Sequence, residues 1–414
     1  MVIYFFAEHY PNPYKPYYDV QLIHYLQKGF RIKVFAAGSY LSTINREVTR
    51  YNLRQYVSYY PTTLKSIPKY MYIILFNMIN NPHRIFKIAN KIYDRNIQFK
   101  LNLMNICRMC VLPEQSPDVC YVNNLATASQ FMFLKKLYND SKIIMYYHGG
   151  EIEGMPRIGN EKAIFDCYHA VLTNTNRSAI NAISRGCDKD KIIVRPICFN
   201  INDYPDYDKI YMKNETLHLI SIGRLSKEKG YLYAIEAVKE LVVSGQYRIH
   251  YTIVGRGPDE AALRNQIEML NLNRYIKLVG EKSKEEIKEI LKNMDVLILP
   301  SIRRNTCEEN QACVLQEAML MKLLIIASNI GGVPESISEE MKDYLVDQNN
   351  ASMIANMIKN IICMKNEQRA KFGESNRQYV VKNYHIENDG LYNYIINMPA
   401  KDKNTFKQSN AHLM

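Results

Sequence analysis

The sequence LHLISIGRLSKEKG, residues 217–230, joins a short apolar segment to a basic loop bounded by two glycines. Residues 217–222 have the length and composition of a buried strand, and residues 230–244 are predicted to form the helix that follows. A strand, a tight loop and a helix open a βαβ unit, in which consecutive strands lie parallel. The stretch therefore predicts a parallel α/β domain that begins at Leu217.

The same alternation of strand and helix continues on both sides of this stretch. Downstream, strands are predicted at 248–254, 275–279, 296–299 and 323–328, with helices at 259–270, 284–294 and 312–321. Upstream, strands at 2–7, 31–36, 118–122, 142–147, 170–173 and 191–195 alternate with helices at 18–28, 125–138 and 177–185. Two Rossmann-like, doubly wound parallel-sheet domains are therefore expected, at 1–200 and 217–375, joined by a Pro-, Asn-, Asp- and Tyr-rich linker at 201–216. Because ligands of such domains bind at the carboxyl ends of the strands, we expect the site in the cleft between the domains.

Composition agrees with a folded protein of two domains. The chain has 414 residues, of which 47% are hydrophobic and 23% charged, which argues against disordered or collagen-like sequence. No signal-peptide pattern follows the first apolar run, and residues 70–79 are about half the length of a bilayer span, so we expect a cytoplasmic protein. Cys107 and Cys110 form a single CxxC without a second ligand pair, so they are expected to be buried, reduced core residues.

The charge of the chain is uneven. The net charge is +12, and residues 41–110 hold eleven Lys and Arg against two acidic residues, Glu47 and Asp94. This excess indicates an anionic partner, which leaves nucleic acid, an acidic membrane surface and a phosphorylated substrate as alternatives.

The loop after residue 222 has the features of an anion site. A strand–loop–helix junction presents free backbone N–H groups and the positive end of a helix. Gly223 opens this loop, and Arg224 and Lys229 add two cations, which suits a diphosphate; the alternative is a solvated turn. A second glycine turn, IVGRGP at 253–258 with Gly255, lacks the third glycine of a dinucleotide fingerprint, so nicotinamide and flavin are not favoured.

A pair of glutamates lies near the start of the helix predicted at 312–321. Glu309 precedes this helix, and Glu317 lies one to two turns inside it. If the helix starts near Ala312, its N-terminal amides lie beside Glu309. On spacing alone, a capping glutamate and an ordinary helix acid are the simpler interpretation.

Taken together, these motifs resemble the family 4 glycosyltransferases, which have the GT-B fold, are retaining and use nucleotide-diphosphate sugars. The resemblance is close from Leu217 to about Glu335, where GGVPE closes the pattern, and looser in the first half. It implies that a terminal helix at 376–396, within the segment 376–414, crosses back to the first domain. It also implies a site whose residues are catalytic (His148, which follows the strand at 142–147, Glu309, Arg224 and Lys229) or donor-binding (Gly223, Arg224, Lys229, Gly255, Glu309, Ala312, Cys313, Val314 and Glu317).

Three departures from the family pattern affect this expectation. The loop EHYPNPYK at 8–15 stands where the family often has Gly-Gly, and Lys322 and Leu324 replace the usual Gly and Pro. Glu308 directly precedes Glu309, so the identity of the functional acid is ambiguous by one residue, although the spacing favours Glu309.

The resemblance implies transfer of a sugar, with retention, to a hydroxyl of a glycan or a lipid-linked oligosaccharide in cell-surface polysaccharide biosynthesis. No cofactor or metal is expected, because the loop cations and a helix end can stabilise the departing diphosphate. Alternatives are a nucleotide-sugar 2-epimerase of the same fold and a non-catalytic basic protein that binds membrane or nucleic acid. Residues 41–110 could dock on the inner face of an anionic membrane or could be ordinary basic surface helices; nucleic acid is not expected, because no RNA-binding motif accompanies the charge.

Overall fold

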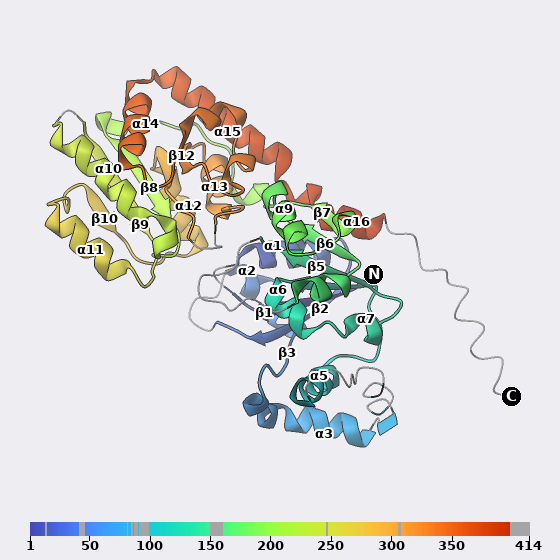
Figure 1. The fold of residues 1–414 in the computed structure, drawn as a ribbon. Helices are drawn as coiled ribbons and strands as arrows, with labels where there is room; N and C mark the ends of the chain where they lie inside the picture. Colours follow the sequence, from blue (N-terminus) through green and yellow to red (C-terminus); the bar gives the residue numbers. More distant parts are fainter. Residues whose placement is uncertain are drawn as a thin grey trace.

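The computed structural model describes residues 1–12, 15–40, 46–80, 82, 83, 86, 90, 99–149, 160–245, 247–304 and 308–397. Two α/β domains follow one another along the chain, each built on its own parallel sheet (Figure 1). The predicted fold class, two doubly wound α/β domains in tandem, is confirmed.

The N-terminal domain contains a seven-stranded sheet in the order β3-β2-β1-β4-β5-β6-β7. All its strand pairs are parallel. The strands are β1 (Val2–His9), β2 (Arg31–Gly38), β3 (Val57–Tyr59), β4 (Val119–Asn123), β5 (Lys142–Tyr147), β6 (Ala170–Thr173) and β7 (Ile192–Val194). The chain winds in one direction from β1 to β3 and in the other from β4 to β7, which makes the sheet doubly wound.

Helices lie on both faces of this sheet, and a helical pair, α3 (Met71–Asn80) and α5 (Phe99–Val111), lies beyond its edge (Figure 1). The other described α-helices of this domain are α1 (Tyr17–Gln27), α2 (Arg46–Arg50), α6 (Leu125–Gln130), α7 (Leu134–Leu137), α8 (Glu161–Asp166) and α9 (Asn176–Ser184). Successive residues of β1 point to opposite faces, so Tyr4 and Phe6 enter one hydrophobic cluster while Ile3 and Phe5 enter the other. Burial on both faces explains the nearly continuous apolar sequence of this strand.

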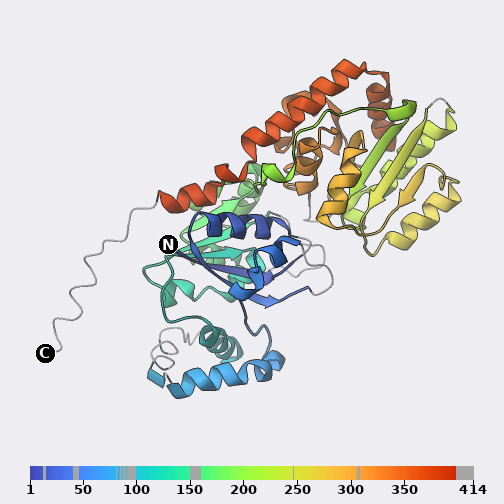
Figure 2. The same ribbon diagram turned by 180° about the vertical axis from the view of Figure 1, so that it is seen from behind.

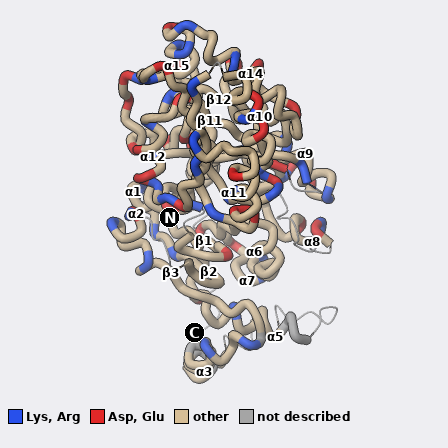
Figure 3. Tube along the Cα trace, turned by 90° about the vertical axis from the view of Figure 1, so that its left-hand side faces the viewer, with Lys and Arg blue, Asp and Glu red and all other residues tan. Residues whose placement is uncertain are grey.

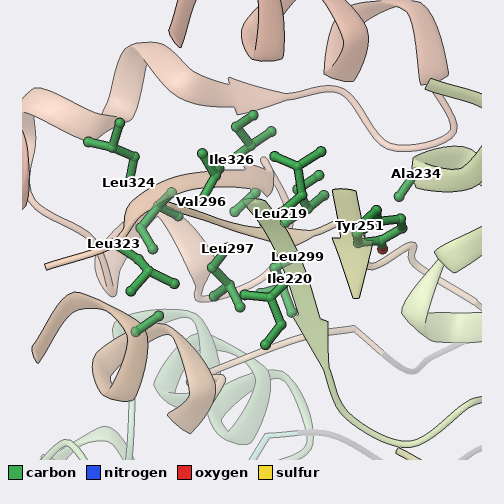
Figure 4. Close-up of a cluster of buried hydrophobic side chains, with 14 of the residues drawn as sticks. Leu219, Ile220, Ala234, Tyr251, Val296, Leu297, Leu299, Leu323, Leu324 and Ile326 are labelled. Carbon is green, nitrogen blue, oxygen red and sulfur yellow. The ribbon is translucent and has the colours of Figure 1, made fainter. Parts of the chain in front are cut away.

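The C-terminal domain contains a six-stranded sheet in the order β10-β9-β8-β11-β12-β13, with its core on both faces (Figure 4). The strands are β8 (Leu217–Ile222), β9 (Ile249–Val254), β10 (Ile276–Leu278), β11 (Val296–Leu299), β12 (Leu324–Ser328) and β13 (Leu345–Val346). The helices are α10 (Tyr231–Val243), α11 (Glu260–Met269), α12 (Lys284–Lys292), α13 (Cys313–Leu320), α14 (Ala351–Cys363) and α15 (Asn366–Asn383). The carboxyl ends of β8 and β11, the two central strands, carry the basic loop and the segment before the paired glutamates.

The chain returns to the N-terminal domain after α15, as Figure 2 shows from behind. The short helix α16 (Gly390–Ile396) places Leu391 and Ile395 in a hydrophobic cluster of the N-terminal domain. The prediction of a single terminal helix at 376–396 is wrong. Helix α15 begins at Asn366, and a turn that includes the 3₁₀ helix η9 (Ile386–Asn388) separates it from α16.

Two further sequence predictions differ from the structure. The helix predicted at 125–138 is broken into α6 and α7 at Phe131, which ends α6 with a non-helical backbone and is fully buried. The short edge strands β3 and β13 were not predicted, because two or three residues carry no periodic signal. Cys107 and Cys110 are buried residues of α5, as predicted.

Lys322, which stands where the family usually has glycine, adopts a left-handed backbone with φ 58°. Glycine is favoured at such positions because a Cβ atom adds strain. The side chain of Lys322 forms ion pairs with Asp206 at 2.7 Å and with Glu374 at 2.9 Å. These contacts tie the linker and α15 to the end of α13, so the lysine contributes interactions that a glycine cannot.

Candidate functional site

The basic loop after β8 meets the segment after β11 through an ion pair. Lys229, at the end of the 3₁₀ helix η6 (Lys227–Lys229), approaches Glu309 with its Nζ 2.6 Å from Oε2. Ser301 donates a second hydrogen bond to the same oxygen at 2.9 Å. Gly230 allows this approach: its φ is +64°, and a Cβ there would lie 2.0 Å from the carbonyl oxygen of Pro300. The two predicted site residues Lys229 and Glu309 are therefore in direct contact.

The environment of Glu309 keeps its carboxyl group ionised. Burial by itself raises the pKa, but the Lys229 ammonium and the Ser301 hydroxyl outweigh it, and the pKa lies below its usual value. The side chains of both partners are mostly buried, at 25% exposed for Lys229 and 14% for Glu309. A negative group and a positive group are thus held at the carboxyl ends of adjacent central strands.

The other loop residues predicted for the site lie on the basic loop and on the glycine turn next to it. Arg224 is exposed on the same basic loop. Gly255, after β9, packs so tightly against that loop that a Cβ atom would lie 1.9 Å from the carbonyl oxygen of Gly223. The two glycine turns therefore touch, and a side chain at Gly255 would push its turn away from the loop that carries both Arg224 and Lys229.

Helix α13 points its amino end toward the same region. Ala312 is its N-cap, and no side chain among the described residues accepts from the first-turn amides there. Cys313 packs against hydrophobic clusters of both domains, and burial, followed by nearby Glu317 and Glu309, raises the pKa of its thiol. Val314 is half-buried beside it. The first turn of α13 thus lies at the contact between the two domains with uncapped amides.

Glu317 lies further along α13 and accepts a hydrogen bond from Tyr204. The Tyr204 hydroxyl donates to Oε1 of Glu317 at 2.9 Å, and the tyrosine itself is 1% exposed. Burial raises the pKa of Glu317 above its usual value, although Lys284, Tyr204 and Lys288 each oppose this shift. Tyr204 was not predicted as a site residue, because a tyrosine in an irregular linker carries no sequence signal for such a role.

His148 follows β5 on the N-terminal side of the domain contact. Its ring stacks on Tyr146 with centroids 4.6 Å apart and lies 5.9 Å from the ring of Tyr17. Within the described residues its buried Nε2 atom has no hydrogen-bond partner. Burial, with a smaller contribution from Lys15, lowers the pKa of His148 to about 3, so the imidazole is neutral at pH 7. A cavity of about 20 Å³, which it lines together with Asp389, is large enough for about one water molecule.

The adjacent glutamates 308 and 309 point to different partners. Glu308 contacts Arg177 of α9 and Arg303, with its Oε2 2.6 Å from the latter. Because Arg177 belongs to the N-terminal domain, Glu308 forms a contact between domains, whereas Glu309 faces the basic loop of its own domain. The one-residue ambiguity in the sequence thus corresponds to two side chains in different environments.

Glu335 forms a second contact between the domains, which we call the Glu335–α9 contact. Its Oε2 accepts from the backbone N of Asn176 at 2.7 Å and from Nδ2 of the same residue at 2.9 Å. Its Oε1 accepts from the backbone N of Arg177 at 2.8 Å. A carboxylate of the C-terminal domain therefore occupies the amino end of a helix of the N-terminal domain.

Gln311 completes this interface. Its side chain accepts from the backbone N of Ile197 at 2.7 Å and donates to the carbonyl oxygen of the same residue at 2.8 Å. Gly332 fits against Thr175, whose Cγ2 atom would lie 2.6 Å from a Cβ at this position. Sequence reasoning did not identify these residues, because their partners lie more than 100 positions away in the chain.

Two features are absent from the described part of the chain. No group of three or more His, Cys, Asp and Glu residues there could hold a metal ion. Nor does any described helix have the length and hydropathy needed to cross a bilayer.

The two sheets and their connection have the GT-B fold, as the similarity to solved structures shows. HepE from Anabaena, solved with UDP-glucose, superposes with a TM-score of 0.67 at 15% identity over 96% of this chain and 98% of that chain. TarM superposes with a TM-score of 0.70 at 13% identity, again over 96% and 98%.

Sequence comparison finds similarity to glycosyltransferases. Residues 205–379 match the family described as "Glycosyl transferases group 1". The amylovoran biosynthesis glycosyltransferase AmsK of Erwinia amylovora is 29% identical over 56% of this chain and 57% of its own length. A putative colanic acid biosynthesis glycosyltransferase, WcaL of Salmonella typhimurium, is 32% identical over 42% of each chain. The chain thus matches about half the length of these curated relatives.

Proposed function

We propose that this protein is a retaining glycosyltransferase that moves a sugar from a nucleotide-diphosphate sugar to a hydroxyl of a glycan or lipid-linked oligosaccharide in exopolysaccharide biosynthesis. The contact between Lys229 and Glu309, at the carboxyl ends of β8 and β11, carries the proposal. The names of the relatives support the biosynthetic setting, and the UDP-glucose complex of HepE supports a nucleotide-sugar donor.

The charges around this pair fit a diphosphate leaving group. Lys229 and the exposed Arg224 lie on one loop, and the uncapped amino end of α13 lies across from it. Preorganised positive groups of this kind stabilise negative charge that develops as the glycosidic bond to the diphosphate breaks. We propose that they do so without a metal or other cofactor.

The two glutamates and the histidine would then hold the rest of the donor. Glu309, ionised and fixed by Lys229, would accept from hydroxyls of the donor sugar. Glu317, oriented by Tyr204, would accept from a ribose hydroxyl. His148, neutral at pH 7, would hydrogen-bond to the sugar or its phosphate through its unpartnered Nε2. Front-face attack by the acceptor would retain the anomeric configuration.

We further propose that the acceptor is met at the inner face of an anionic membrane. The basic excess at residues 41–110, with eleven Lys and Arg against two acids, would attract the protein to acidic lipid. A lipid-linked acceptor would be presented at that surface.

The first experiment is a thermal-shift panel of UDP, GDP and ADP and their sugar conjugates, with wild type and Glu317→Ala. A ligand at about a hundredfold excess over Kd adds about 2.7 kcal/mol of stability, so one nucleotide should raise the midpoint by several degrees. The shift should be lost in Glu317→Ala.

Product analysis then tests the chemistry. Incubation with the responding sugar nucleotide and a polysaccharide-repeat acceptor should yield a glycoside with the anomeric configuration of the donor. Interconversion of the free sugar nucleotide without transfer would indicate a 2-epimerase instead. Absence of any nucleotide response would contradict the proposed donor site.

A further inference from the structure

Helix α3 exposes four apolar side chains, which form a stripe along it. Tyr72 is 78% exposed, Leu75 46%, Phe76 53% and Ile79 76%. Their spacing, i, i+3, i+4 and i+7, places all four on one side of the helix. The Tyr72 and Phe76 rings stack with centroids 6.1 Å apart, so the stripe presents a continuous surface.

The opposite side of α3 already has its partner. Ile74 is 7% exposed and packs in a small hydrophobic cluster with Tyr70, Cys107 and Cys110. At about 100° per residue, the four stripe residues occupy an arc roughly 100° wide, centred on the side away from Ile74. The stripe is therefore not needed to attach α3 to α5.

The charges near the stripe are positive. The 3₁₀ helix η2 (Leu64–Tyr70), which leads into α3, carries Lys65 and Lys69, both exposed. None of η2, α3 and α5 contains an acidic residue. Helix α3 itself carries no charged residue, and Figure 3 shows no Asp or Glu on the tube of α3 or α5.

The position of α3 leaves the stripe accessible. In three views α3 and α5 form the end of the molecule opposite the C-terminal domain, beyond the edge of the N-terminal sheet (Figures 1–3). A large flat partner can approach this end without meeting either the C-terminal domain or the basic loop.

We infer that the α3 stripe docks on an anionic lipid bilayer, with Tyr72, Leu75, Phe76 and Ile79 entering the headgroup boundary and Lys65 and Lys69 contacting acidic headgroups. An apolar stripe flanked by cations has the two properties that interfacial helices use. The inference rests on the proposed function in one respect, since it makes the lipid-linked molecule the acceptor class.

Other occupants fit the charges less well. A second copy of the chain would bring the same lysines face to face, which repels. Nucleic acid would call for cations at the centre of the surface, where this stripe has aliphatic and aromatic side chains. An anionic bilayer matches both the apolar centre and the positive border.

The test is co-sedimentation of the full-length protein with phosphatidylcholine vesicles, with and without phosphatidylglycerol. We compare wild type with Phe76→Glu/Ile79→Glu. The matched control is Val243→Glu/Met269→Glu, two equally exposed apolar positions on α10 and α11. All four positions are on the surface, so each variant should fold, which circular dichroism checks.

Wild type and the control should bind vesicles that contain phosphatidylglycerol. The α3 variant should bind them at least about tenfold more weakly, because two large apolar side chains lose their transfer into the interface. Lys65→Glu/Lys69→Glu should reduce binding to the anionic vesicles and remove its salt dependence.

Equal sedimentation of wild type and the α3 variant would overturn the inference, as would absence of binding by wild type. A dimeric wild type with a monomeric α3 variant would show instead that the stripe joins two copies, and would also overturn it. Activity toward a soluble acceptor keeps the two proposals separate. The α3 variant should retain activity toward the soluble acceptor. If the proposed function is wrong, wild type should lack this activity but still bind vesicles.

Discussion

Replacing Glu335 by alanine should separate the two domains, because it removes the Glu335–α9 contact. Three hydrogen bonds of 2.7, 2.8 and 2.9 Å reach this one carboxylate from Asn176 and Arg177. The substitution leaves the backbone carbonyl of Glu335 in place, which accepts from Tyr379 and Tyr384 within the C-terminal domain. Its effect should therefore be confined to the interface.

The magnitude follows from the geometry of the contact. A hydrogen bond to a charged group contributes about 1.5–3 kcal/mol, and a carboxylate at a helix amino end contributes about 0.3–1 kcal/mol. Asn176 is exposed, so water replaces part of the hydrogen-bond energy when the domains separate. Helix α9 also keeps its own cap, Thr175. We expect about 2 kcal/mol in total, or roughly a thirtyfold increase in the population of separated domains.

Hydrogen exchange at Ile197 measures this population away from the substituted residue. Its backbone N–H donates to Gln311 across the interface and becomes accessible when the domains part. In Glu335→Ala this amide should exchange about thirtyfold faster, and Glu335→Gln, which retains one acceptor oxygen, should be intermediate. The control Glu339→Ala removes an ion pair with Lys342 within the C-terminal domain and should leave the rate unchanged. An unchanged rate in Glu335→Ala would refute the role of the contact.

Four further predictions concern the candidate site. Lys229→Met should weaken nucleotide binding at least about tenfold and destabilise the protein by about 2 kcal/mol, because Glu309 loses its cation. In Lys229→Met/Glu309→Gln, calorimetry should show that the stability is recovered but the nucleotide affinity is not. Burial raises the pKa of Glu317 above its value in the unfolded chain, so the folded protein loses stability as the pH rises past that unfolded-state pKa. Glu317→Gln should therefore raise Tm by about 2–4 °C at pH 8 but not at pH 4. His148 has a pKa of about 3, below its unfolded value, so wild type should lose stability as the pH falls from about 6.5, and His148→Gln should lose less over the same titration. Gly331→Ala should destabilise the protein by about 1–3 kcal/mol in urea unfolding and reduce activity, since its Cβ would lie 1.8 Å from the carbonyl oxygen of Glu309; a neutral outcome would contradict this packing.

Much of the fold could be predicted because its signals are local. Strands β5, β6, β8 and β11 have the predicted bounds, since each is a short apolar run ended by a glycine, a polar residue or proline. Parallel pairing then follows from the alternation with helices. The edge strands and the break between α6 and α7 could not be predicted, because they depend on neighbours supplied by other parts of the chain.

The candidate site was predictable to a lesser degree. Lys229 and Glu309 are 80 residues apart, and the resemblance assigned both to one donor site, but their direct contact was not predicted. By contrast, the partner of Glu317 is a linker tyrosine whose neighbours in sequence indicate only irregular structure. Roles beyond these contacts stay predictions until the nucleotide panel and the variants are measured.

The order of apolar and polar residues along this chain was sufficient to determine two parallel α/β domains and the loops that carry the charged motifs, because hydrophobic period and turn chemistry act over a few residues. Tertiary structure alone decided that Glu308 reaches Arg177 of the other domain while its neighbour reaches Lys229. It also decided that α3, with a sequence as apolar as many core helices, keeps Tyr72 and Ile79 on the surface. Both outcomes depend on which distant segment packs against a side chain, and that is settled only when the whole chain has folded.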